Sequence, residues 1–449
     1  MQYISLKIKK FLKKKFIFFI ATSFSGLLVN NYAEATILNN SYKEVIDHVW
    51  QIVYRDFLDS NGKFEKSNWI ELRKKFLSKK YSGNEEAYDA IRDMLANLDD
   101  PYTRFLEPKE FNQMRIDTSG ELTGVGIQIF KDKDSDDLII ISPIEGTPAY
   151  DAGIKAKDKI LSIDGVSTKS MDIEDAVKLI RGQRGTKVKL QILRGGKSFY
   201  KSLARERIEI KSVSSKINQT KSGLLVGYVR IKQFNANASN EMKDTLIHLE
   251  TKKVSGYILD LRSNPGGLLD SSIDISRQFI NKGIIVSTLT KDGLKEVKRG
   301  NGKALTKKPL VVLVNEGSAS ASEIVSGAIR DNKRGKLVGK KTFGKGLVQS
   351  MRTLVDGSGL TVTVAKYLTP NGTDINKFGI IPDVEVKMNS NPILQREIGT
   401  RRDKQYKAGE KELIKIIKIK NKNSQFDPKT KNLNSFLKNN KKKLVFSLI

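Results

Sequence analysis

Residues 311–329 pass from the pattern of a strand, through a glycine, into the pattern of a helix. The apolar run Val311–Val314 ends before Gly317, and apolar residues then recur with helical spacing at Ala321, Ile324, Val325, Ala328 and Ile329. A helix that begins here leaves backbone N–H groups unpaired beside small hydroxyl residues. Ser320 could therefore project its hydroxyl into a cleft, next to donors able to hold an oxyanion. The same residues also fit a serine N-cap followed by a capping glutamate, and the pattern alone leaves both interpretations open.

A nucleophilic serine needs a base, and the usual choice is histidine. The chain has only two histidines, His48 and His248, and neither has catalytic-looking neighbours. It has no cysteine, which excludes a thiol nucleophile and argues against a zinc site. Lys345 stands out because glycines flank it and apolar runs lie on both sides, a setting that could bury its ammonium group. Burial lowers a lysine pKa from about 10.4 and provides a neutral fraction that can act as a base, whereas a solvated lysine would not.

Four segments of the chain resemble the carboxyl-terminal processing (tail-specific) proteases, a family of serine peptidases with a Ser–Lys dyad. They are residues 98–105, 260–267, 315–323 and 342–346, in the order that the family has them. The resemblance covers roughly residues 40 to 390. It implies a multidomain α/β protein with an N-terminal helical region, a PDZ domain and an α/β peptidase core.

The resemblance also implies roles for individual residues. Ser320 would be the nucleophile, Lys345 the general base and Gln349 a polar residue that positions the lysine. The backbone N–H groups of Gly266 and Ala321 would form the oxyanion hole. No metal or organic cofactor is expected.

The first 35 residues have the pattern of a secretory signal peptide. Six lysines precede the apolar segment 16–29, and Ala33-Glu34-Ala35 fits a cleavage site. The apolar segment is shorter than the roughly 20 residues that span a bilayer. We therefore expect an exported, periplasmic protein, with an uncleaved membrane anchor as the alternative.

Four further segments follow the signal peptide. We expect a helical region over 36–114, a PDZ domain over 115–205, a serine peptidase core over 206–390 and a basic tail over 391–449. Helices are predicted over 42–56, 69–76 and 84–98, and a hairpin is predicted where 347–354 and 360–368 pair across Asp356–Gly359. The tail, with sixteen basic and five acidic residues, is expected to be a solvated extension, or a contact with an anionic surface.

The PDZ assignment depends on an ordered set of short patterns. The loop that would bind a substrate's terminal carboxylate is Gly124, Val125, Gly126 and Ile127, because glycines let successive N–H groups point inward. Val177 and Ile180 belong to the helix expected to line the peptide groove. The alternative is a PDZ fold that packs without binding peptide.

The formal net charge of +30 first suggests nucleic acid as a partner. Lysines are scattered through every segment and no nucleic-acid motif with interleaved aromatic residues is present, so we do not expect that partner. The expected partners are protein or peptide substrates with accessible C-termini, with a homo-oligomer, an activating adaptor and peripheral membrane contact as further possibilities. The alternative function is a non-catalytic PDZ scaffold that binds peptides.

Overall fold

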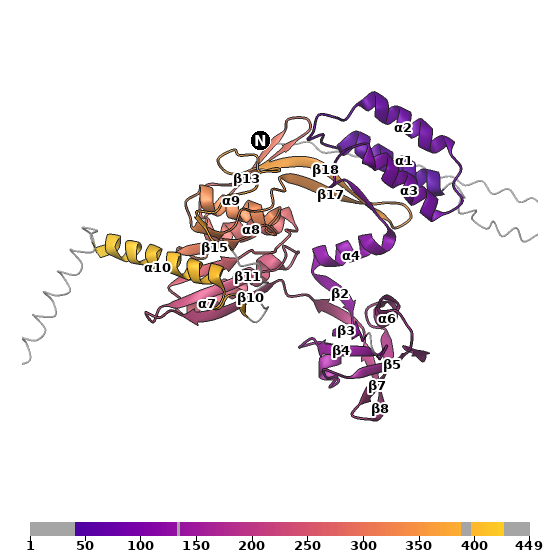
Figure 1. The fold of residues 1–449 in the computed structure, drawn as a ribbon, viewed down its shortest axis with the longest axis horizontal. Helices are drawn as coiled ribbons and strands as arrows, with labels where there is room; N and C mark the ends of the chain where they lie inside the picture. Colours follow the sequence, from indigo (N-terminus) through magenta and orange to yellow (C-terminus); the bar gives the residue numbers. More distant parts are fainter. Residues whose placement is uncertain (1–40, 133–134, 388–396, 426–449) are drawn as a thin grey trace, which may run out of the picture. The chain divides into compact units, whose positions relative to one another are not determined.

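The structure, a computed structural model, describes residues 41–132, 135–387 and 397–425. The predicted signal peptide, residues 1–35, lies outside the described residues, as does the last part of the tail. Figure 1 shows the order of the elements along the chain. Within these described ranges, no helix is both long enough and apolar enough to cross a bilayer.

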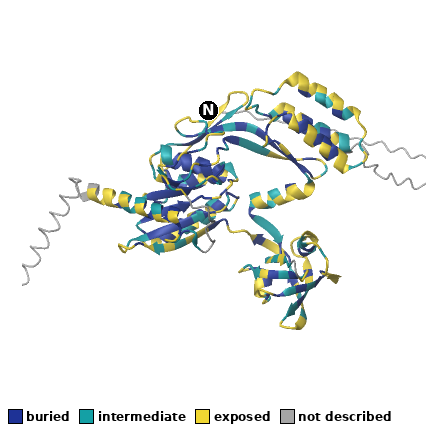
Figure 2. Cartoon of the chain, in the orientation of Figure 1, coloured by how far each residue is buried: buried dark blue, intermediate teal, exposed yellow. Residues whose placement is uncertain are grey.

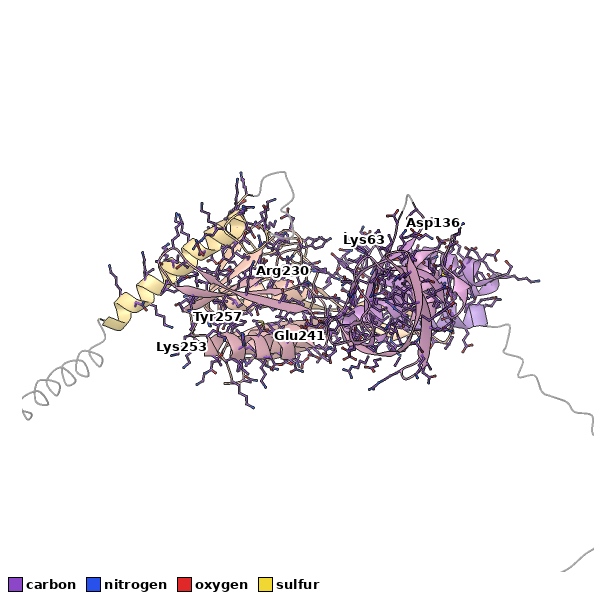
Figure 3. All side chains as sticks on the ribbon, turned by 90° about the horizontal axis from the view of Figure 1, so that it is seen from below. Lys63, Asp136, Arg230, Glu241, Lys253 and Tyr257 are labelled. Carbon is purple, nitrogen blue, oxygen red and sulfur yellow. The ribbon has the colours of Figure 1, made fainter. Side chains whose placement is uncertain are left out.

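The predicted peptidase core is built on a six-stranded sheet, here called the central sheet, in the order β10-β11-β12-β15-β16-β19. Only the edge strand β10 runs antiparallel to its neighbour. The strands are β10 (Val213–Gln219), β11 (Leu225–Ile231), β12 (Gly256–Asp260), β15 (Leu310–Val314), β16 (Lys336–Gly339) and β19 (Val384–Glu385). At the start of β10, the backbone N–H groups of Ser212 and Val213 donate hydrogen bonds of 3.0 and 2.9 Å to the carboxylate of Glu241. Glu241 is labelled among the side chains in Figure 3. A largely parallel sheet is what alternating strand and helix patterns predict, so the α/β assignment is confirmed.

Helices cover both faces of the central sheet. On one face lie α7 (Ala238–Thr251), α8 (Leu269–Phe279) and α9 (Ala321–Asp331). On the other lies α10 (Lys404–Gln425). Strand β15 shows the consequence, because Val312 packs on the first side and Leu313 on the second, and all five residues of the strand are fully buried (Figure 2). A strand covered on both faces has a continuous apolar sequence rather than an alternating one.

The helix α10 corrects the expectation of a solvated extension over residues 391–449 for the part that the structure describes. Tyr406, Leu413 and Ile417 lie on one side of this helix and are buried against the central sheet. Lysines occupy much of the remaining surface of the helix, and they dominated the composition of the segment. The apolar residues recur at helical spacing, and that spacing decides where the segment lies.

A second sheet carries the N-terminal helices. Its order is β1-β18-β13-β14, and β17 also pairs with β18. Its strands are β1 (Arg104–Leu106), β13 (Ile284–Thr290), β14 (Lys295–Arg299), β17 (Leu347–Thr353) and β18 (Gly359–Leu368). The predicted hairpin is present as the antiparallel pair β17–β18. The helices α1 (Ser41–Asp56), α2 (Lys66–Ser78) and α3 (Asn84–Ala96) share one apolar cluster with residues of β18, including Leu360 and Val362.

The predicted PDZ domain has its own sheet and its own core. The sheet runs β3-β4-β5-β7-β8, with β6 beside β5. Its elements are β3 (Ile127–Lys131), β4 (Leu138–Pro143), α5 (Pro148–Asp151), β5 (Lys159–Ile163), β6 (Val166–Ser167), α6 (Ile173–Ile180), β7 (Lys187–Arg194) and β8 (Lys197–Ala204). Ile140, Ile160 and Leu190 are among its buried core residues.

Two connections lead into this domain. Helix α4 (Pro108–Ser119) is continuous across positions 114 and 115, where we expected one segment to end and the next to begin. A two-stranded ribbon of β2 (Glu121–Gly124) and β9 (Glu206–Glu209) follows, so the chain enters and leaves the PDZ domain side by side. The domain limits themselves stay predictions.

Candidate active site

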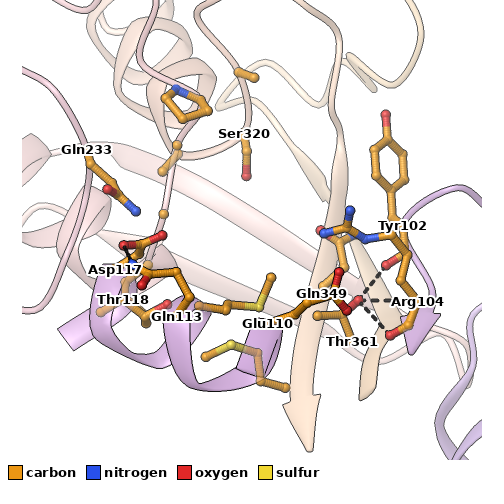
Figure 4. Close-up of a pocket in the computed structure, with 18 of the residues that line it drawn as sticks. Tyr102, Arg104, Glu110, Gln113, Asp117, Thr118, Gln233, Ser320, Gln349 and Thr361 are labelled. Carbon is orange, nitrogen blue, oxygen red and sulfur yellow. Dashed lines mark hydrogen bonds between the residues drawn. The ribbon is translucent and has the colours of Figure 1, made fainter. Parts of the chain in front are cut away.

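Ser320 lies on the turn between β15 and α9, at the N-cap position of the helix. Its backbone has φ 54° and ψ −115°, a region that residues with a side chain rarely adopt. Such strain concentrates at functional sites, and a sharp strand–turn–helix corner is one way in which hydrolases expose a nucleophilic serine. The Ser320 side chain points into the open space of a cleft of about 1970 Å³ (Figure 4). The serine therefore occupies the N-cap position and also presents its hydroxyl to the cleft, so the two sequence interpretations are compatible.

Ser318, two residues earlier, ties this turn to the segment 260–267. Its hydroxyl donates to the carbonyl oxygen of Leu261 at 2.8 Å and accepts the N–H of Asn315 at 3.0 Å. The N–H of Ala319 donates to the carbonyl oxygen of Asn264 at 3.1 Å. The turn that carries Ser320 and the segment 260–267, here called the glycine-rich loop, are thus held together by these hydrogen bonds.

Gly266, the first predicted oxyanion residue, lies directly beside the serine. Its φ is +109°, and a Cβ built on it would be 2.9 Å from the Cβ of Ser320 and 3.1 Å from the nitrogen of Ala321. Only glycine fits this position without displacing its neighbours. The N–H of Gly266, however, donates to Oδ1 of Asn264 at 2.9 Å, in a local turn that the sequence analysis missed. The role of Gly266 as an oxyanion donor stays a prediction, and it requires that this N–H be shared or released.

Ala321, the second predicted donor, is the first residue of α9. The first N–H groups of a helix have no acceptor within the helix, so they are free to bind an anion. Ala321 and Gly266 both line the same cleft as Ser320. The structure therefore brings the predicted nucleophile and both predicted donor residues together.

A buried arginine holds the base of the glycine-rich loop. The Arg262 guanidinium donates to the carboxylates of Asp260 (2.9 and 2.6 Å) and Asp403 (2.9 and 2.6 Å), and both carboxylates are fully buried. The hydroxyl of Tyr228 also donates to Asp260, at 2.6 Å. Burial alone would lower the pKa of Arg262, but these carboxylates outweigh it and raise the pKa. Because Asp403 lies immediately before α10, the C-terminal helix is connected directly to the loop that carries Gly266.

Lys345 lines the same cleft, half-buried on the loop before β17. Its Nζ lies 4.7 Å from the ring centroid of Tyr102. In the described part of the chain, Nζ forms neither a hydrogen bond nor an ion pair, and it lies over the Tyr102 ring instead. Burial lowers the pKa of Lys345, the positive charge of Arg104 lowers it further, and Asp100 opposes both. A lysine with a lowered pKa in a shared cleft is suited to act as a base.

The glycines beside this lysine permit a close approach of two backbones. A Cβ on Gly346 would lie 2.7 Å from the backbone nitrogen of Asn376. Any side chain there would push the loop away from its support. Glycine at position 346 is therefore what allows the two backbones to lie so close together.

Among the described residues, no hydrogen bond joins the side chain of Gln349 to Lys345. Its Nε2 donates to Oγ1 of Thr363 at 3.4 Å, and that hydroxyl donates to Oδ2 of Asp100 at 2.6 Å. Asp100 also accepts from Oγ1 of Thr103 at 2.7 Å. The role of Gln349 in positioning the lysine therefore stays a prediction.

The segment 98–105 contributes more than the sequence analysis assigned to it. It was identified only as a matching motif, yet it supplies the aromatic ring over Lys345 and two of the charges that act on it. The hydroxyl of Thr361 donates to the carbonyl oxygen of Tyr102 at 2.9 Å and so holds this segment against β18 (Figure 4). The signal that could have identified these residues was the presence of a tyrosine and charged residues within a family motif.

The predicted peptide-binding residues of the PDZ domain lie at the edge of its sheet. Gly124 to Ile127 connect β2 to β3, and β3 pairs only with β4 among the described strands. Helix α6 lies beside β3, with Val177 half-buried and Ile180 buried in the domain core. An open edge next to a helix is the geometry to which an extended peptide can add as a further strand. Val177 remains a candidate contact, whereas Ile180 serves the core.

Two family models match this chain. Residues 225–386 match peptidase family S41 and residues 139–194 match the PDZ domain. The Peptidase S41 segment contains Gly266, Ser320, Ala321, Lys345 and Gln349.

Curated relatives match over most of their length. The carboxyl-terminal-processing protease of Synechocystis sp. is 45% identical over 362 residues, which are 80% of this chain and 84% of the relative. The carboxy-terminal processing protease CtpA of Bacillus subtilis is 38% identical over 355 residues, 78% of this chain and 74% of the relative. Among solved structures, the photosystem II D1 C-terminal processing protease is 36% identical, with a TM-score of 0.50, covering 77% of this chain and 93% of that one. The expected family, the PDZ domain and the α/β peptidase fold are thereby confirmed, and the non-catalytic alternative is not favoured. The chain belongs to peptidase family S41, as a member of the carboxyl-terminal-processing proteases.

Proposed function

We propose that this protein is an endopeptidase that cleaves protein substrates recognised through their C-terminal residues, with Ser320 as nucleophile and Lys345 as general base. The observation that carries the proposal is the shared cleft. Ser320 on its strained turn, the N–H of Ala321 at a helix N-terminus and a half-buried lysine with a lowered pKa all line it.

The proposed reaction begins with the neutral form of Lys345. Its side chain swings from the ring of Tyr102 toward Ser320 and takes the hydroxyl proton as the serine attacks the scissile carbonyl. The N–H of Ala321, with a donor from the Gly266 loop, stabilises the negative oxygen, a contribution of about 3–4 kcal/mol per donor in comparable enzymes. The protonated lysine then gives its proton to the leaving amine, and water hydrolyses the acyl-enzyme.

Substrate capture is assigned to the PDZ domain. A substrate's last residues would add to the open edge of β3, and its carboxylate would bind the N–H groups of the loop from Gly124 to Ile127. The side chain of Val177 on α6 would contact an apolar residue of the peptide. This reading is supported by the unpaired edge of β3 within the described sheet.

The cellular setting is proposed from the sequence. The segment 1–35 supports export to the periplasm, and the basic C-terminal residues support peripheral contact with an anionic membrane surface. A homo-oligomer or an activating adaptor is compatible with these features. Fractionation of cells that produce the full chain tests the location.

The test of the reaction uses an unstructured polypeptide with a free apolar C-terminus. Mass spectrometry would follow its cleavage by the wild-type protein, by Ser320→Ala and by Lys345→Ala. We expect cleavage by the wild type alone, with peptide binding retained in both variants. Cleavage by either variant at the wild-type rate would refute the dyad. The same polypeptide with an amidated C-terminus tests capture, because removing the carboxylate should raise KM.

A further inference from the structure

Glu323 is a fully buried carboxylate on the first turn of α9. Within the described residues, no lysine, arginine or histidine forms an ion pair with it. A glutamate that merely caps a helix can remain in contact with water, so capping alone does not account for this burial. Burying an ion without a counter-charge is costly, and it persists where hydrogen bonds replace its water.

Four donors surround this carboxylate. Oε1 accepts Oγ1–H of Thr342 (2.6 Å) and the N–H of Gly344 (2.8 Å). Oε2 accepts the N–H of Ser320 (2.9 Å) and the N–H of Lys345 (2.9 Å). Burial raises the pKa of Glu323, and these hydrogen bonds oppose that rise. Because each oxygen already accepts two hydrogen bonds, the site fits the ionised form.

Tyr367 on β18 makes the complementary contacts from the other side. Its hydroxyl lies 3.1 Å from the carbonyl oxygen of Ser320 and also contacts the carbonyl oxygen of Lys345. Burial raises the pKa of Tyr367 well above its usual value, and the nearby Glu323 adds to this, so the phenol stays a donor. The same two residues, 25 positions apart in sequence, are thus held by their N–H groups on Glu323 and by their carbonyl oxygens on Tyr367.

We propose that Glu323 and Tyr367 are positioning residues that clamp the backbones of the serine and the lysine at the separation needed for proton transfer. The proposal rests on the proposed Ser320–Lys345 dyad. Neither residue needs to touch substrate. The clamp explains why the buried carboxylate is retained and why the lysine loop can carry flexible glycines without losing its place.

The clamp predicts a large effect from a small change. Tyr367→Phe removes one hydroxyl and leaves two carbonyl oxygens without it. Glu323→Gln keeps the shape of the side chain, but its amide N–H₂ would face two donors. A displacement of about 1 Å between reacting groups costs on the order of 100-fold in rate. We expect each variant to lower kcat about 10- to 100-fold while KM changes less than about threefold.

The control is Ser326→Ala, which removes a buried hydroxyl from α9, the helix that carries Glu323. The Ser326 hydroxyl donates to the carbonyl oxygen of Ser322 at 2.7 Å and touches neither clamped residue. All variants would be made in the full chain, and kcat, KM and Tm would be measured together. We expect Ser326→Ala and Tyr367→Phe to lower Tm similarly, with kcat reduced only in Tyr367→Phe.

The following outcomes decide whether Glu323 and Tyr367 act as a clamp. Wild-type kcat in Tyr367→Phe would overturn the clamp, as would an equal loss of kcat in Ser326→Ala. If Glu323→Gln fails to fold, Tyr367→Phe alone still decides. A double variant no worse than the poorer single variant supports a shared clamp, since residues that act as a unit are not additive, whereas multiplied losses would show separate roles and overturn it. If Ser320→Ala keeps full activity, the dyad itself fails, which is a different result from wild-type activity in Tyr367→Phe alone.

Discussion

The close approach of Gly266 to Ser320 gives the most direct test of the site geometry. In Gly266→Ala, the new methyl group would lie 2.9 Å from the Ser320 Cβ and 2.9 Å from the carbonyl oxygen of Ala319. Non-bonded carbon atoms have an optimal separation of about 3.5–4.0 Å, so the Gly266 loop and the Ser320 turn must move apart by roughly 0.6–1.1 Å. A shift of about 1 Å costs on the order of 100-fold in rate, equivalent to about 2.7 kcal/mol of transition-state stabilisation. We therefore expect kcat to fall about 100-fold.

The same substitution also strains the backbone, and a matched variant separates the two effects. Gly357, in the β17–β18 turn, has φ +83°, and a Cβ on it would meet no atom within 4 Å. Left-handed backbone costs roughly 1–2 kcal/mol for a residue with a Cβ, so both alanine variants should lose stability of this order. Thermal unfolding would measure that loss, and a peptide-cleavage assay would measure kcat. If Gly266→Ala folds and keeps kcat within threefold of wild type, the inferred adjacency of the glycine loop and the serine is refuted.

Three further predictions concern charge. Burial lowers the pKa of Lys345, and a lysine in the proposed role of general base must be neutral. The value of kcat/KM should therefore rise with pH and level off below the value of about 10.4 expected for a free lysine, and a plateau reached only above pH 10.4 would contradict this. Replacing Tyr102 by leucine removes a ring that stabilises the Lys345 ammonium by about 0.5–2 kcal/mol, so the midpoint of the rise in kcat/KM should move down by about 0.4–1.5 pH units. Phenylalanine at this position should leave the midpoint nearly unchanged, and an upward movement in the leucine variant would count against the contact. Replacing Arg262 by methionine leaves Asp260 and Asp403 buried without a counter-charge, so the free energy of unfolding measured with urea should fall by about 3–5 kcal/mol. A fall of less than about 1 kcal/mol would show that the Arg262 network does not stabilise the fold.

Local patterns predicted the elements that carry the site. The apolar run of β15 and the helical spacing of α9 are set by burial on defined faces, and that information is periodic in the sequence. The hairpin of β17 and β18 followed from its turn residues. Family motifs then identified Ser320 and Lys345 among many serines and lysines.

Individual hydrogen bonds at the site could not be predicted in this way. The sequence did not indicate that the N–H of Gly266 donates to Asn264, or that Gln349 binds Thr363 instead of the lysine. Each of these choices depends on which of several nearby partners the folded chain places within hydrogen-bond distance. The burial of helix α10 was missed for a related reason, since lysines outnumber the few apolar residues that determine it.

The link from Arg262 to Asp403 has a consequence for the order in which a nascent chain matures. The two residues are separated by 141 positions, and synthesis proceeds from the N-terminus. When Ser320 and Lys345 leave the ribosome, the arginine beneath the glycine-rich loop still lacks one of its two carboxylates. The loop therefore reaches its final support only after Asp403 and the following helix have been translated and have docked. A chain that lacked Asp403 would leave Arg262 with Asp260 as its single carboxylate partner in this network, and the loop that carries Gly266 would lose part of its support.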